Sequence, residues 1–435
     1  YRNGTKFQCL SWEVRNLMGA YAGPKTPTRN LVFAYSMGNT KNSFKGMPTT
    51  NLKVNGNGDF SNGTTDWIVT SGVSTEILPK FKGARNVLKL TRTANVAGYN
   101  GIRSTGITVS PSTWYTFSMR IFIPAAMQQN IRLYCGERAD TTILNWRVVQ
   151  TSSASPGGTW QILTSSFQTG ATANNFAQAP YLDWNTTAST IDEVVYVDWY
   201  QVEQQSFGTP FVDGTRSNTQ ALLDMAGGNT ITATSLTYAA DNTFSFDGSG
   251  TTDGVTTGDY ISVTESLTKT DTTTYPNGCT YNFWLYVDSD AVDRMALFWG
   301  AGTIRHIELY STGKYFRTEA ATENGYSFGT STFPDAVRGA YSHFSIVFAN
   351  GESGRPVRWY QNGTLFHTHT SMDSGTGGAT EYFSFSGIGR STGSVSFAYA
   401  KSFDGEIPNF SIYDKALTAS EVKQNFNAIR GRFGI

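Results

Sequence analysis

Apolar residues recur at every second position in several separate stretches of this chain. Three of these stretches are Tyr115, Phe117, Met119, Ile121 and Ile123; Tyr281, Phe283, Leu285 and Val287; and Phe344, Ile346 and Phe348. Successive side chains of a β-strand point to opposite faces of a sheet, so this period predicts strands with one face in a core. Asn362-Gly363, between two further apolar stretches, predicts a type I′ hairpin turn. The chain is therefore predicted to be all-β and built from antiparallel sandwiches.

One short helix is predicted near the end of the chain. Thr418 and Glu421 have the spacing of a capping box, and Leu417 and Val422 have that of a hydrophobic staple. The pattern continues with apolar residues at helical spacing and a glycine stop signal, namely Phe426, Ile429 and Gly431. Helix is therefore expected chiefly over residues 418–430.

The chain has 435 residues, which suits two or three domains. Residues 1–50 have no sustained periodicity and are predicted to be an irregular N-terminal arm or docking segment. One β-sandwich is expected over residues 51–207 and a second over residues 211–435. The apolar residues 31–35 leave two alternatives open. They form an edge strand or partner contact, or residues 31–48 belong to the C-terminal sandwich and residues 51–205 are inserted into it.

Composition excludes several classes of partner. Charged residues make up 15% of the chain and cancel to a net charge of zero, so no basic surface for nucleic acid or an anionic membrane is expected. No apolar run approaches the ~20 residues that span a bilayer, so no membrane insertion is expected. The cysteines, Cys9, Cys135 and Cys279, lie far apart and are predicted to be buried thiols rather than disulfide or zinc ligands.

Two regions resemble known families. Residues 51–205 contain, in order, N-G-D-F-S-N-G…W, V-S-P-S-T-W-Y-T-F-S, G-G-T-W-Q and Y-V-D-W-Y-Q-V-E, and this order resembles jelly-roll carbohydrate-binding modules. Residues 211–430 contain F-D-G…D-Y-I and end in I-Y-x-x-A-L-T-x-x-E-V, which resembles laminin-G/concanavalin-like jelly-roll domains. This C-terminal motif is typical of such domains on bacteriophage structural proteins. The resemblance therefore implies a virion protein.

No catalytic residue is predicted. The E-x-D-x-x-E strand motif of concanavalin-like glucanases is absent, and so is a G-x-S-x-G elbow. The nearest carboxylates have the wrong spacing and lie in the other domain; they are Asp192, Glu193, Asp198 and Glu203. They are interpreted as ordinary strand charges.

Glycan binding needs an exposed aromatic face with polar groups beside it. Tyr181, Asp183, Trp184 and Asn185 offer this mixture in an expected loop, and Trp184 is the first choice for a stacking residue. Tyr326 is a lesser candidate in the second sandwich.

The sequence indicates one possible cofactor, a structural calcium ion bound by a loop of the second sandwich. Asp247, Asp253 and Asp259 surround a polar loop and could supply oxygen ligands, and related sandwiches hold calcium near such loops. Asp next to Gly is also common in turns, so a calcium site and an ordinary turn both stay open as interpretations of this loop.

The function predicted from these features is that of a non-enzymatic bacteriophage virion protein, a fibre, decoration or other appendage on the particle surface. Its expected partners are other virion proteins, copies of itself and host-surface glycan. The alternative is a secreted bacterial lectin or the accessory carbohydrate-binding part of a polysaccharide-degrading enzyme.

Overall fold

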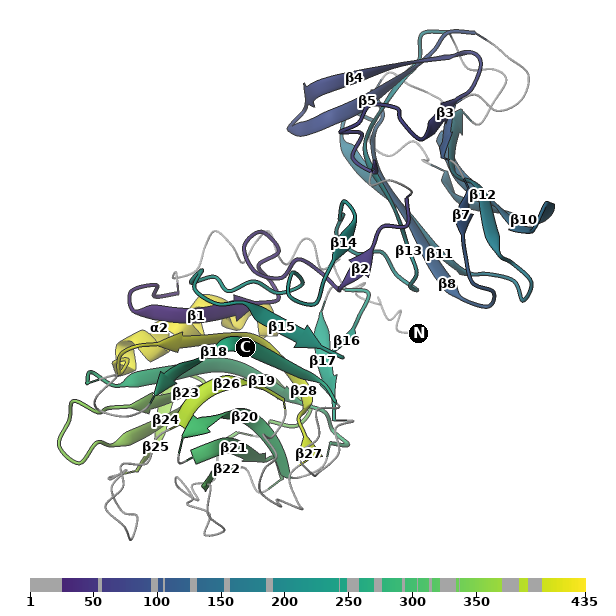
Figure 1. Cartoon of the computed structure of the whole chain (residues 1–435). Helices are drawn as coiled ribbons and strands as arrows, with labels where there is room; N and C mark the ends of the chain where they lie inside the picture. The colour runs from purple at the N-terminus through teal and green to yellow at the C-terminus, as the bar shows by residue number, and fades with distance from the viewer. Residues whose placement is uncertain are drawn as a thin grey trace, which may run out of the picture. The chain divides into compact units, whose positions relative to one another are not determined.

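The computed structural model of the chain divides into two compact units. One, the inserted unit, is Met47–Ser217, and the other, the enclosing unit, consists of the chain up to Gly46 and Asn218–Ile435. The structure describes residues 26–53, 57–94, 101–104, 106–125, 131–151, 157–184, 191–241, 243–248, 258–269, 276–291, 294–302, 304–312, 315–320, 334–335, 337–369, 383–389 and 401–435. Figure 1 shows both units as packed sheets.

Two antiparallel sheets enclose the core of the enclosing unit. The first contains, in order, β16 (Thr237–Tyr238), β17 (Phe244–Asp247), β28 (Asp404–Tyr413), β19 (Cys279–Val287), β23 (Ser342–Phe348), β24 (Val357–Gln361) and β25 (Thr364–His369). The second contains β15 (Ile231–Thr234), β18 (Tyr260–Lys269), β26 (Phe383–Ile388), β20 (Arg294–Gly302), β21 (Ile304–Tyr310) and β22 (Tyr315–Ala320), with β27 (Lys401–Ser402) paired to β20 in parallel. Their inner faces share one apolar core.

The first described strand lies in this unit. Strand β1 (Leu31–Ser36) pairs antiparallel with β28, and Figure 1 shows the purple strand beside the yellow one. Phe33 and Tyr35 are fully buried, and the Tyr35 hydroxyl donates to the Ile407 carbonyl at 2.9 Å. Among the described residues β28 is the one strand neighbour of β1, so β1 is an edge strand of this sheet.

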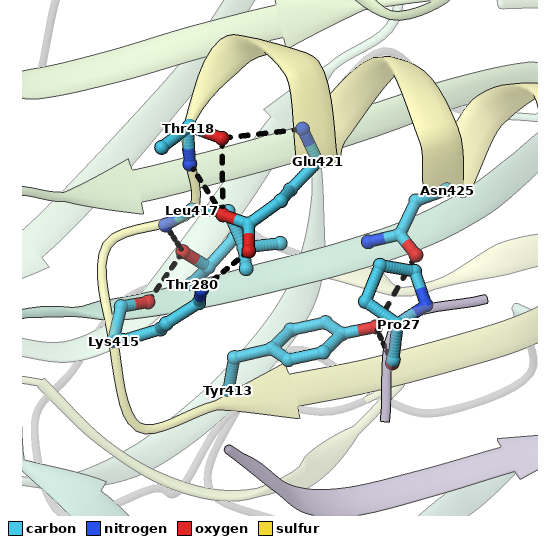
Figure 2. A network of polar contacts seen from close by, with 8 residues as sticks. All are labelled: Pro27, Thr280, Tyr413, Lys415, Leu417, Thr418, Glu421 and Asn425. Carbon is cyan, nitrogen blue, oxygen red and sulfur yellow. Dashed lines mark hydrogen bonds and ion pairs between the residues drawn. The ribbon is translucent and has the colours of Figure 1, made fainter. Parts of the chain in front are cut away.

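Helix α2 (Ala419–Ile429) covers part of the first sheet. Its capping box is complete, because the Glu421 N–H donates to Thr418 and the Glu421 carboxylate accepts the Thr418 N–H at 2.9 Å. Figure 2 shows this cap beside Tyr413, whose hydroxyl bonds to Asn425 on the helix and to the Pro27 carbonyl. The chain then tightens into the 3₁₀ turn η2 (Arg430–Phe433), so the left-handed glycine is Gly434 and not the expected Gly431.

Removing the cap should destabilise the enclosing unit measurably. Thr418→Ala deletes the oxygen that accepts the Glu421 N–H, and the loss of such a cap costs about 1 kcal/mol of unfolding free energy. Urea unfolding checks this value, with Thr418→Ser as the control because serine keeps the acceptor. Equal unfolding midpoints for the alanine and serine variants would contradict it.

Two sheets also form the inserted unit. The six-stranded sheet contains β10 (Thr142–Thr151), β9 (Ile131–Ala139), β12 (Asn175–Trp184), β6 (Gly101–Ser104) and β3 (Trp67–Val69), with β7 (Ile107–Thr108) paired to β12. The five-stranded sheet contains β11 (Trp160–Gln168), β8 (Trp114–Phe122), β13 (Val194–Glu203), β5 (Ala84–Arg92) and β4 (Val73–Phe81). Their facing side chains form a second, separate core.

The two ends of the inserted unit lie side by side. Strands β2 (Thr49–Thr50) and β14 (Thr215–Arg216) pair with each other, and the Asn51 N–H donates to the Gly214 carbonyl at 2.7 Å. The Arg216 guanidinium also donates to the Met47 carbonyl at 2.9 Å. Entry to and exit from the unit are therefore tied together.

The all-β fold with a short C-terminal helix is confirmed. The alternating residues Tyr281, Phe283 and Leu285 are fully buried, as their period predicts. Cys135 and Cys279 are buried thiols, and Cys9 lies outside the described residues. In the described part of the chain, no helix is long and apolar enough to cross a membrane.

Candidate functional site

The predicted glycan-binding segment forms a strand and not a loop. Tyr181, Asp183 and Trp184 are the last residues of β12, in the interior of the six-stranded sheet. Asn185 and Tyr326 lie outside the described residues. The candidate residues are therefore placed by the register of β12.

Register separates these positions onto two faces. Leu182 lies opposite Ile102 and Leu133, which are both fully buried in the core. Residues directly opposite one another share a face and successive residues alternate, so Tyr181 and Asp183 occupy positions on the outer face of the sheet. Trp184 lies opposite Ile131, another core residue. The register thus favours Tyr181 and Asp183 over Trp184 as glycan contacts.

A row of positions crosses this outer face. Ile68 on β3 lies opposite Arg103 on β6, Arg103 lies opposite Tyr181, and Tyr181 lies opposite Tyr134 on β9. Ile68 is 41% exposed. We call these positions, together with Asp183 and Trp146, the six-stranded face.

Trp146 supplies an exposed aromatic ring on the same face. It lies on the edge strand β10 opposite Gly136, two residues from Tyr134, and it is 39% exposed. An indole ring covers the apolar side of a sugar, while guanidinium and carboxylate groups bond to hydroxyls. Arg103 and Trp146 were not predicted from the sequence, although each occupies an outward position of its strand.

Two of the carboxylates considered for catalysis, Asp198 and Glu203, have structural partners. Asp198 forms an ion pair with Arg120 at 2.6 Å, and burial raises the pKa of Asp198 despite that guanidinium. Glu203 is fully buried and accepts the Thr209 N–H at 3.0 Å. These two groups therefore make contacts within the inserted unit.

The predicted calcium loop is described only at its ends. Asp259 is 1% exposed and accepts the Asp247 N–H at 2.9 Å, and burial is the main cause that raises the pKa of Asp259 to about 7. Asp253 lies outside the described residues. Among the residues that are described, no group of three or more Asp, Glu, His or Cys side chains could hold a metal ion. The described residues alone do not fit calcium, and a site that includes Asp253 stays a prediction.

Further carboxylates gather near this loop. Asp404 lies opposite Asp247 in the β17–β28 pair. Burial and the neighbouring Asp288 raise the pKa of Asp404 to about 6. This end of the enclosing unit is therefore stabilised by protonation.

Two family models match parts of the chain. Residues 254–423 match a model described as the Concanavalin A-like lectin/glucanases superfamily, and residues 53–178 match one described as a carbohydrate binding domain. No match was found among curated proteins.

Several solved structures are similar at low identity. The CBM22-1–GH10 modules of Clostridium thermocellum endo-1,4-beta-D-xylanase 10B are 11% identical over 36% of this chain, with a TM-score of 0.26, and this chain covers 28% of that structure. The CBM22-1 xylan-binding domain of Paenibacillus barcinonensis Xyn10C is 12% identical over 36% of this chain and 94% of that one, with a TM-score of 0.25. The binding domain of botulinum neurotoxin serotype D is 14% identical over 48% of this chain and 50% of that one, with a TM-score of 0.32.

At these identities and TM-scores, the similar structures do not bear on what this chain binds. The family matches are the stronger finding, because one falls in each unit and both describe sandwich folds of the kind observed. Together they support a protein built from carbohydrate-binding β-sandwiches.

Proposed function

We propose that this chain is a non-enzymatic glycan-binding protein and that the six-stranded face holds the glycan. The observation that carries the proposal is the register of β12, which sets Tyr181 and Asp183 beside Arg103 on the outer side of a domain with a carbohydrate-binding family match. Domains of both matched families are typically non-catalytic, which supports binding without turnover.

Binding variants test this face. Tyr181→Ala and Asp183→Ala should each weaken glycan binding about tenfold or more, because removing one buried contact of this kind costs roughly 1–3 kcal/mol. A glycan array selects the ligand, and titration calorimetry then measures its dissociation constant. Trp114→Ala is the matched control, since this 45% exposed tryptophan lies on the other sheet of the same unit.

The same samples test for catalysis. Incubation of the wild-type chain with the selected polysaccharide should release no reducing ends. Unchanged affinity in both Tyr181→Ala and Asp183→Ala would place the glycan elsewhere. Cleavage that a single carboxylate substitution abolishes would replace binding by hydrolysis as the function.

Within this function, we propose a place on the surface of a bacteriophage particle, as a fibre, decoration or other appendage that assembles with other virion proteins or with itself. Its support is the resemblance of the C-terminal segment to phage structural proteins, together with a net charge of zero, which opposes assembly little. The family matches agree equally with a secreted lectin or an accessory part of a polysaccharide-degrading enzyme. Mass spectrometry of purified virions distinguishes these alternatives, because only a virion protein is present at stoichiometric amounts.

A further inference from the structure

The outer face of the five-stranded sheet carries a row of side chains that crosses all five strands. The register places Trp160 opposite Phe122, Phe122 opposite Tyr196, Tyr196 opposite Lys89, and Lys89 opposite Glu76. Three successive members are aromatic, and the last two form an ion pair at 2.9 Å. Such a row lies on one face of the sheet because opposed residues share a face.

The rings of this row form a fixed platform. Phe81, at the end of β4, stacks on Tyr196 with ring centroids 4.0 Å apart, and its edge meets Phe122 at 5.3 Å. Trp160 lies 5.7 Å from Phe122, and its indole N–H donates to the Lys82 carbonyl at 3.1 Å. Phe122 is 4% exposed, whereas the other three rings are only half-buried. We call Phe81, Phe122, Trp160 and Tyr196 the aromatic platform.

Paired charges border the platform. The Arg120 guanidinium lies 4.7 Å from the Trp160 ring centroid and pairs with Asp198, as Lys89 pairs with Glu76. Because Arg120 and Lys89 each have an anion beside them, these two pairs attract neither anions nor cations strongly, and Lys82, whose ammonium lies 5.1 Å from the Phe122 ring centroid, adds a single positive charge. The border still offers N–H donors and carboxylate acceptors. A ligand that matches such a surface is neutral, has an apolar face and carries hydroxyl groups.

The other half of this outer face is covered by the chain itself. After β13 the chain folds back over the sheet, where the Gln205 carbonyl accepts the Thr116 hydroxyl at 2.8 Å and Phe211 stacks on Trp199 at 5.1 Å. On the platform side, by contrast, Ile162 lies opposite Arg120 and is 60% exposed. The aromatic platform therefore lies in a part of this face that the chain does not cover.

We propose that the aromatic platform is a second glycan-binding surface, specific for a neutral polysaccharide. Trp160 and Tyr196 stack on sugar rings, and the paired charges of Arg120 with Asp198 and of Lys89 with Glu76 bond to hydroxyls. This surface belongs to a different sheet from the six-stranded face, so it stands whether or not that face binds.

Affinity electrophoresis of the full chain tests the proposal. The probes are hydroxyethylcellulose and galactomannan, which are neutral, and polygalacturonate, which is anionic. Trp160→Ala should weaken retardation by a neutral probe about tenfold, as expected for the loss of a stacking residue. Ile162→Asp should do the same without touching the core, because this side chain is largely exposed. Trp114→Ala, on the same sheet face but at the other end of β8, should be retarded like the wild type.

Nuclear magnetic resonance locates the contact directly. The chain has ten tryptophans, and the indole N–H signal that is lost in Trp160→Phe should be the one that shifts when a neutral oligosaccharide is added to the wild type. Wild-type retardation in Trp160→Ala and Ile162→Asp would overturn the proposal, as would retardation by polygalacturonate alone. Retardation lost in Tyr181→Ala but kept in Trp160→Ala would support the six-stranded face and overturn the platform. The reverse result would support the platform alone.

Discussion

Acidification from pH 7 to pH 4 is expected to lower the unfolding free energy of the enclosing unit by about 3 kcal/mol through His343 alone. The ring is fully buried under helix α2, next to Trp284 and Phe426. Burial is the main cause that lowers the pKa of His343 to about 3, with a smaller contribution from Lys423. One nitrogen, Nε2, lies 2.8 Å from the Asn282 Oδ1, whereas Nδ1 has no partner among the described residues.

The direction of this pH effect follows from the pH at which the folded and the unfolded chain each take up a proton. The unfolded chain takes up a proton on this ring near pH 6.5, while the folded chain stays neutral until about pH 3. The unfolded state therefore binds more protons between these values, and this part of the stability is complete above pH 6.5 and is lost as the pH falls towards 3. Asp259 and Asp404 act in the opposite direction, because their raised pKa values favour the folded state at low pH.

A variant separates these opposing effects. His343→Gln keeps a side-chain N–H for Asn282 but does not titrate. Both Asp groups are unchanged in it, so the difference between the wild-type and variant unfolding free energies reports His343 alone. Denaturant titrations at pH 7, 5 and 4 should give a difference that changes by about 3 kcal/mol over the range. Parallel pH profiles would show that the ring does not titrate as argued.

Deleting residues 26–46 is expected to unfold the enclosing unit while leaving the inserted unit folded. The segment supplies four fully buried side chains to the core, namely Phe33, Tyr35, Met37 and Phe44. Burial of each contributes about 1.5–3 kcal/mol, so their loss removes roughly 6–12 kcal/mol, which is as much as a typical domain has. The deletion also removes β1, so the C-terminal half of β28 loses its hydrogen-bonded neighbour on that side.

Excision of the inserted unit is the matched control. Thr49 and Arg216 lie opposite one another in the β2–β14 pair, so a short Gly/Ser turn can join them in place of residues 50–215. That chain should unfold cooperatively with the enclosing unit intact, as measured by near-ultraviolet circular dichroism and thermal melting. A folded enclosing unit without residues 26–46, or an unfolded one after excision, would contradict this account.

Sequence patterns predicted those features of the fold that depend on residues close together in the chain. The alternation at Tyr281–Leu285 specifies which face of β19 joins the core between the two sheets, and the capping box fixes where α2 begins, since both depend on neighbours within a few residues. The place of β1 could not be decided in this way. Its partner β28 lies more than 370 residues away, and nothing near Leu31 encodes that pairing.

The candidate site was predicted in part. Tyr181 and Asp183 were identified from their chemistry, but the segment was interpreted as a loop, since Trp184 stands between two polar residues ahead of a Thr-rich stretch. The structure accommodates Pro180 at a register shift between Ala177 and Tyr181, where a missing N–H costs least. Arg103 was missed because β6 has only four residues, too few for an alternation to stand out.

The position of β28 also has a consequence for how the protein is made. This last strand lies in the interior of its sheet, between β19 on one side and β1 and β17 on the other. The enclosing sandwich therefore cannot close until Tyr413, the last residue of β28, has left the ribosome, whereas the inserted unit can fold before that point. Until then, the unpaired edges of β1 and β19 are exposed to neighbouring nascent chains. Production of this protein should accordingly be limited by the step at which β28 is made, and slower translation or chaperone capture at that step should raise the soluble yield more than changes elsewhere.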